Sequence, residues 1–152
     1  MCSSDLRARA IAGQLAAQFP GRAEPQQLFG DIAMHEKDFA GAASAYQRAV
    51  DLQVQARRHP AAAFGDTMDS FGTEDAQNDW PLLAALGAAL EQAGHWPQAH
   101  AVLERALALA PDRPMLLNFL GYGDLEHAAD DPHAVVAARI RLEKALSLAP
   151  DD

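Results

Sequence analysis

Six histidines are the residues of this 152-residue chain that most readily suggest chemistry, because neutral imidazole is a common metal ligand. A helical metal site needs two histidines four residues apart on one face, as in the HExxH pattern. No pair has that spacing among His35, His59, His95, His100, His127 and His133. We therefore predict no metal site and interpret these histidines as solvent-exposed residues of turns.

The sequence also lacks the motifs that other types of reaction need. The chain has no G-x-S-x-G elbow for a nucleophilic serine and no glycine-rich phosphate loop before a helix. The pair Asp130-Asp131 lacks the alternating oxygen ligands of a calcium loop, and Asp131 before Pro132 is better explained as a helix N-cap. The sole cysteine, Cys2, excludes an internal disulfide. We predict a protein that is not an enzyme and holds no cofactor.

Composition and charge narrow the class of partner. Hydrophobic residues make up 49% of the chain, but aromatics only 7%, and alanine, the strongest helix former, is abundant, which favours an all-α fold. The net charge is −9, and no Lys or Arg lies between Arg58 and Arg105, so a phosphate-neutralising surface is not expected. No apolar run reaches the roughly 18–20 residues of a membrane span. We expect a protein or peptide partner, with no nucleic acid and no membrane span.

Small residues recur along the chain at fixed spacings, which indicates an internal repeat. Each unit has a glycine after a large apolar residue, then an alanine twelve residues later and another alanine seven residues after that. The third unit keeps the seven-residue step, but its glycine lies five residues farther upstream. The three sets are Gly30, Ala42 and Ala49; Gly87, Ala99 and Ala106; and Gly121, Ala138 and Ala145.

This pattern resembles the tetratricopeptide repeat, in which each unit of about 34 residues forms two antiparallel helices. The resemblance implies an all-α, right-handed helical-hairpin solenoid with one lone helix followed by three hairpins. The repeat domain would cover residues 7–152, with its lone helix at Arg7 to Phe19. We expect the hairpins at about 23–57, 80–111 and 114–150, and an irregular insert at about 59–79.

Local signals place the helix ends. In the middle unit Gly94 would end the first helix, Trp96 and Pro97 would open the second, and Pro111 would stop it. The first unit departs from the pattern, because Lys37 stands where the turn usually has glycine and Val54 where proline is usual. We therefore expect its second helix to run on towards Arg58.

The insert at about 59–79 has no clear period. We interpret it as a loop or a short extra helix between repeats. The alternative is a flap in which Phe64, Met68 and Phe71 cover the groove of the solenoid.

The resemblance also implies a concave groove, lined by the first helix of each hairpin, that holds a peptide or a partner helix. A carboxylate clamp is not expected, since Asp31 and Ala88 stand where such clamps have asparagine. We expect neutral or basic peptides with an apolar anchor to bind, and Asn118 and Tyr122 to make the best contacts, unless they pack between units. By the resemblance the groove residues are Gln27, Asp31, Met34, His35, Ala84, Ala88, Glu91, Asn118, Tyr122, Leu125 and Glu126.

We therefore predict a non-catalytic protein–protein interaction scaffold. The alternative is the substrate-recruiting arm of a larger enzyme, of the glycosyl- or sulfotransferase type. We expect the chain to be a fragment of a longer bacterial repeat protein, with self-association through uncapped ends. Residues 1–6 read as a translated sequencing-adapter end or a disordered start, and an alternative makes Cys2 the lipid-bearing first residue of a lipoprotein.

Overall fold

The structure is a computed structural model that describes residues 3–58, 79–128 and 131–149. Over these residues the secondary structure consists of α-helices joined by short turns, without strands. α1 already begins within the segment 1–6 that we expected to be adapter-derived or disordered. The helices are α1 (Ser3–Gln18), α2 (Glu24–His35), α3 (Phe39–Arg58), α6 (Trp80–Gln92), α7 (Trp96–Leu109), α8 (Pro114–His127) and α9 (Pro132–Leu148).

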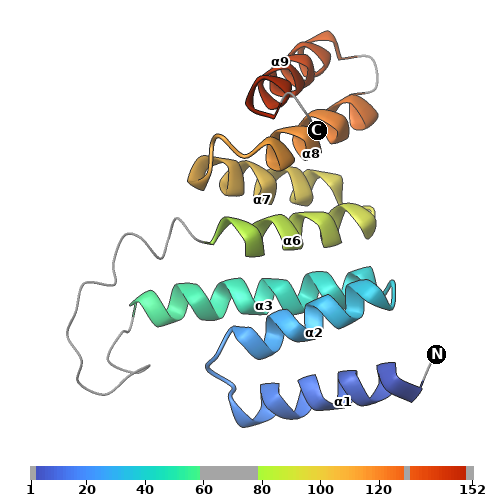
Figure 1. The fold of residues 1–152 in the computed structure, drawn as a ribbon, viewed down its shortest axis with the longest axis vertical. Coiled ribbons are helices and arrows are strands. Elements are labelled where there is room, and N and C mark those ends of the chain that lie inside the picture. The colour runs from blue at the N-terminus through green and yellow to red at the C-terminus, as the bar shows by residue number, and fades with distance from the viewer. Residues whose placement is uncertain (1–2, 59–78, 129–130, 150–152) are drawn as a thin grey trace.

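The helices stack in chain order into one elongated array, and each runs antiparallel to the one before it (Figure 1). α2 pairs with α3, α6 with α7, and α8 with α9, so three hairpins follow the lone helix α1. α2, α6 and α8, the first helices of the three hairpins, consequently run in the same direction (Figure 1). The predicted all-α helical-hairpin solenoid is confirmed.

Proline and a capping carboxylate account for the helix starts. Each helix from α2 onwards, except α3, has a proline in its first two positions, where its fixed φ suits the helix and its missing N–H is not needed. Asp131 caps α9, because its Oδ1 accepts from the backbone N–H of His133 at 2.9 Å, as predicted. Asp38 caps α3 in the same way through the N–H of Gly41, at 3.0 Å.

The turns inside the first two hairpins have the same geometry although their sequences differ. After α6, Gly94 adopts a φ of +81°, and the next residue donates its N–H to the carbonyl of Leu90 at 2.8 Å. After α2, Lys37 adopts a φ of +61°, and the next residue donates to the carbonyl of Ala33 at 2.8 Å. The lysine therefore takes the left-handed conformation that glycine adopts more easily.

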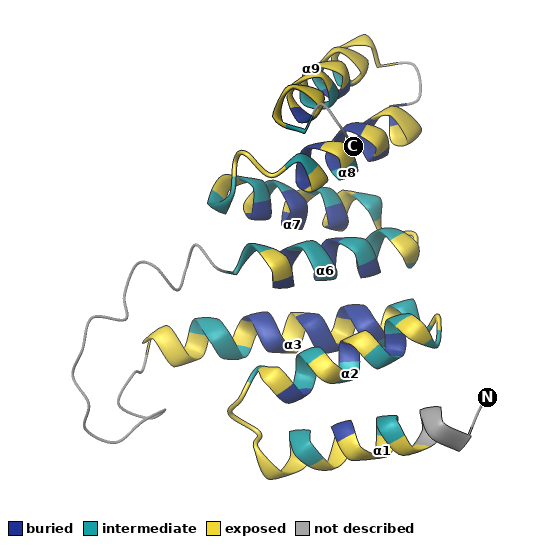
Figure 2. Ribbon diagram, in the orientation of Figure 1, coloured by how far each residue is buried: buried dark blue, intermediate teal, exposed yellow. Residues whose placement is uncertain are grey.

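The repeated glycines let a large side chain of the second helix lie on the backbone of the first. A Cβ at Gly30 would lie 2.5 Å from the ring of Tyr46, and one at Gly87 would lie 2.6 Å from Leu103. These contacts bring the helices of each hairpin close together, and the core follows them through the array (Figure 2). The largest fully buried side chains are Leu86, Leu103, Leu116 and Leu120.

α3 ends at Arg58, so the first hairpin has the long second helix that we expected. α3 and α6 lie side by side, and Arg57 near the end of α3 forms an ion pair with Asp79 before α6. The predicted insert, with its proposed flap residues, lies outside the described residues apart from Asp79. Each described helix is too short or too polar to cross a lipid bilayer.

Candidate functional site

A pocket of about 550 Å³ lies on α8, between the end of α6 and the last turns of α9. One residue of α6, Glu91, lines it, and Ala145 and Leu146 of α9 line it with Ala149 just beyond that helix. The residues of α8 that line the pocket are Pro114, Met115, Asn118, Phe119, Tyr122, Gly123 and Glu126.

Helical periodicity explains why α8 presents these residues together. Met115, Asn118, Tyr122 and Glu126 are three or four residues apart, so they form one stripe along the helix. Tyr122 is 65% exposed and Met115 is 54% exposed, so both present apolar surface to solvent. The stripe offers apolar surface beside a phenol, a carboxamide and a carboxylate.

The charged groups of the pocket are acidic. Glu91 accepts a hydrogen bond from the side-chain amide of Gln92 at 2.8 Å, and within the described part of the chain Glu126 has no hydrogen bond or ion pair. No Lys or Arg is among the described residues that line the pocket. The pocket therefore carries two carboxylates without a cationic partner.

The structure brings together four of the eleven predicted groove residues: Glu91, Asn118, Tyr122 and Glu126 all line the pocket. Leu125 is exposed on α8 but does not line it. On α6, Ala84 packs against the core and Ala88 is half-buried. The four predicted residues of α2 lie two hairpins away, outside the pocket; they are Gln27, Asp31, Met34 and His35.

Among those four, Asp31 and Met34 already have contacts within the first hairpin. The hydroxyl of Tyr46 donates to Asp31 Oδ1 at 2.7 Å, and Met34 packs against the core. Burial raises the pKa of Tyr46, and the hydrogen bond to the Asp31 carboxylate raises it further. Asp31 is thus engaged with α3, in contrast to Glu126.

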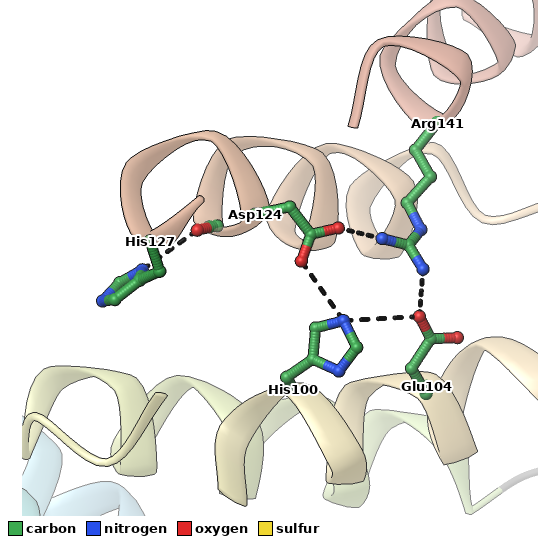
Figure 3. A network of polar contacts seen from close by, with 6 residues as sticks. His100, Glu104, Asp124, His127 and Arg141 are labelled. Atoms are coloured by element: carbon green, nitrogen blue, oxygen red, sulfur yellow. Dashed lines mark hydrogen bonds and ion pairs between the residues drawn. The ribbon is translucent and has the colours of Figure 1, made fainter. Parts of the chain in front are cut away.

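A polar network joins α8 to α7 and α9 (Figure 3). Arg141 of α9 donates to Asp124 of α8 and to Glu104 of α7. His100 of α7 lies beside both carboxylates, with its Nε2 3.2 Å from Asp124 Oδ1 and 3.6 Å from Glu104 Oε1. Asp124 points away from Tyr122, because two residues along an α-helix are turned by about 200°. The network therefore ties α8 to both neighbouring helices and leaves its pocket face free.

An aromatic contact holds the other end of the interface between α7 and α8. The ring of Trp96 stacks on that of His127, with centroids 4.8 Å apart and an interplanar angle of 12°. His127 Nδ1 lies 2.9 Å from the carbonyl oxygen of Gly123. A Cβ at Gly123 would lie 2.0 Å from the Trp96 ring, so only glycine admits the indole there.

These contacts correct one prediction and show what the sequence reasoning missed. The interpretation of the histidines as solvent-exposed turn residues is wrong for His100, which is half-buried inside α7 and faces two carboxylates. Met115 and Phe119 were missed, although their spacing from Asn118 and Tyr122 places them on the same helix face.

Comparison with known proteins supports the repeat. Residues 80–124, which cover α6, α7 and most of α8, match the family model for the tetratricopeptide repeat. A search of curated protein sequences gave no match.

Solved structures share the fold over nearly the whole chain. The chain is similar to one chain in the crystal structure of the APC/C hetero-tetramer Cut9–Hcn1, with 17% identity and a TM-score of 0.72 over 97% of this chain and 24% of that one. It is similar to the crystal structure of MamA, with 15% identity and a TM-score of 0.70 over 96% of this chain and 69% of that one. A second MamA structure, MamA MSR-1 C2, has 16% identity and a TM-score of 0.66 over 96% of this chain and 68% of that one. This chain thus spans about a quarter of the first of these chains.

Proposed function

We propose that this helical-hairpin solenoid, which matches the tetratricopeptide repeat over residues 80–124, is a non-catalytic scaffold that holds a peptide or a partner helix in the groove along the first helices of its hairpins. One observation carries the proposal. The pocket on α8 exposes Tyr122 and Met115 beside Asn118, and exposed tyrosine is a frequent anchor of protein interfaces.

The surroundings of the pocket support binding over catalysis. Its described lining offers apolar surface, a phenol, an amide and two carboxylates, but it does not pair a nucleophile with a base. The ion pairs of Arg141 fix α8 through Asp124, which points away from Tyr122. The pocket face is therefore preorganised, and a ligand need not order it. The recruiting arm of a larger enzyme would use the same groove, and no described residue favours that alternative.

Selection from a random-peptide display library tests the proposal. We expect the intact chain to enrich a related set of peptides, and Tyr122→Ala to weaken their binding by about tenfold or more, as for an interface anchor of about 1.4 kcal/mol. Phe19→Ala is the matched control, because Phe19 is an exposed aromatic residue outside the pocket. Enriched peptides whose binding is the same in both variants would contradict a role for this groove.

A further inference from the structure

The two carboxylates of the pocket, those of half-buried Glu91 and exposed Glu126, differ from two other carboxylates nearby in having no cationic partner among the described residues. Glu104 and Asp124 both form ion pairs with Arg141. Glu91 accepts a hydrogen bond only from a neutral side-chain amide, and Glu126 has no hydrogen bond or ion pair among the described residues. A carboxylate at a binding surface favours a cation in the ligand and disfavours an anion. The charge of the pocket is therefore complementary to a basic group.

The geometry of the helices gathers this negative charge at one end of the pocket. Glu91 and Glu126 are the second-last residues of α6 and α8, and the two helices run in the same direction (Figure 1). The carbonyl ends of both helices add partial negative charge in the same place. The opposite end of the pocket, at the start of α8, is apolar and consists mainly of Met115, Phe119 and Leu146.

The distance between the apolar and acidic ends of the pocket determines how far apart the matching side chains of a ligand must be. The apolar end is centred midway between Met115 and Phe119, about nine residues from Glu126 on α8, or about 13 Å at the helical rise. An extended chain advances about 3.3 Å per residue, so it covers this length in about four residues. A large apolar side chain at one end and a basic one at the other would be about four positions apart.

We propose that the pocket binds an extended polypeptide segment with one large apolar side chain and, about four positions away, a lysine or arginine. The apolar side chain lies between Met115, Phe119 and Leu146, and the basic group lies between Glu91 and Glu126. Tyr122 and Asn118 contact the intervening backbone. This inference rests on the proposed function, since it names the kind of partner that the same groove takes.

Fluorescence anisotropy with three labelled nine-residue peptides tests the proposal on the full chain. The first carries Trp and Arg four positions apart in an otherwise Ser/Ala sequence, the second has Glu in place of Arg, and the third has Ala in place of Trp. We expect the first peptide to bind at least about tenfold more tightly than each of the other two. Moving Arg next to Trp should weaken binding severalfold.

Protein variants test whether the two carboxylates cause the preference for the Arg peptide over the Glu peptide. Together, Glu91→Gln and Glu126→Gln should remove most of the difference between the Arg and Glu peptides, because the amides keep the shape and lose the charge. Glu143→Gln is the matched control, since Glu143 is an exposed glutamate of α9 outside the pocket. Circular dichroism of each variant checks that it folds.

The outcomes separate this inference from the function it rests on. Equal binding of the Arg and Glu peptides overturns the inference, and so does a preference that survives the double Gln variant. If library-selected peptides depend on Tyr122 but carry no basic residue, only the inference fails. If no peptide binding depends on Tyr122, the proposed function fails as well. A concentration-dependent dimer that Tyr122→Ala abolishes would assign the pocket to a second copy and overturn the inference.

Discussion

The second and third hairpins carry the same repeat pattern but are held together differently. In the second, α7 buries four residues, Ala99, Val102, Leu103 and Ala106, whereas α9 of the third buries only Ala138 and Ala145. α7 lies between α6 and α8, while α9 packs on α8 (Figure 2). The large exposed apolar residues of α9 are Val135, Val136, Ile140, Leu146 and Leu148.

The repeat motif therefore defines a hairpin, whereas the helices packed beside that hairpin determine how much of it is buried. The third hairpin compensates with polar contacts. Arg141 joins α9 to both α8 and α7, and Lys144 donates to the carbonyl of Pro111 at 3.0 Å and pairs with Asp112. Apolar burial therefore dominates the second hairpin, and charge pairing contributes a larger share in the third.

Truncating a leucine in each hairpin gives the largest expected contrast. Leu103 is fully buried in α7, and Leu103→Ala should lower the free energy of unfolding by about 2–5 kcal/mol. Leu146 is 63% exposed on α9, and Leu146→Ala should change it by less than about 0.5 kcal/mol. Urea denaturation followed by circular dichroism measures both, and equal midpoints would refute the contrast.

The network of the third hairpin predicts the next largest effect. Arg141→Ala should cost about 1.5–3 kcal/mol, because it leaves Asp124, whose side chain is 10% exposed, without its charged donor. Arg139→Ala is the control: Arg139 pairs with Glu143 one turn away at the surface, and its loss should cost about 0.3–0.5 kcal/mol. Adding Asp124→Asn to Arg141→Ala should recover part of the loss. A double variant no more stable than the single one would argue against a paired charge.

Overpacking the close approach inside the second hairpin should have a somewhat smaller effect. Ala106 is fully buried on α7, and Ala106→Leu should destabilise by about 1–3 kcal/mol because the added methylenes need space. Ala101→Leu on the same helix is the control, since Ala101 is exposed. If thermal denaturation gives the same midpoint for both variants, the alanine position is not a close contact.

Helix capping gives the smallest expected difference between the hairpins. Asp131 caps α9 with its side chain, whereas His95 makes no side-chain cap for α7. Asp131→Ala should therefore cost about 1 kcal/mol, and His95→Ala should leave the unfolding midpoint nearly unchanged. A larger loss for His95→Ala would show that the two helix starts are not distinguished by capping.

The fold was predictable because close helix contacts depend on residue size at fixed spacing. Gly30 and Gly87 each receive a large residue that lies sixteen positions later, Tyr46 and Leu103. In the third hairpin the partner of Gly121 is Leu142, twenty-one positions later, which reflects the same five-residue lengthening that the alanines show. Lys37 could not be placed from propensity alone, because the surrounding hairpin holds it in a conformation that favours glycine.

The site was predictable only where one helix face defines it. Asn118, Tyr122 and Glu126 follow from the periodicity of α8. The contribution of Leu146 depends on how α9 folds back, and the sequence carries no local signal for that. The polar network around Arg141 was not predicted for the same reason. Arg141 of α9 contacts Glu104 of α7, two helices earlier in the chain, and neither residue occupies a repeated position.

The shared direction of α6 and α8 also has a kinetic consequence for the proposed ligand. Their carbonyl ends lie on one side of the array, and each helix end carries about half a negative charge. At physiological salt the combined field of these ends and of Glu91 and Glu126 reaches about 8 Å beyond the surface. It would act on the proposed cationic segment before contact, so we expect it to raise the association rate constant, and we expect that constant to fall as salt is added. We expect the residence time to depend instead on the apolar contacts with Met115 and Tyr122, so different parts of one pocket would set the association and dissociation rates.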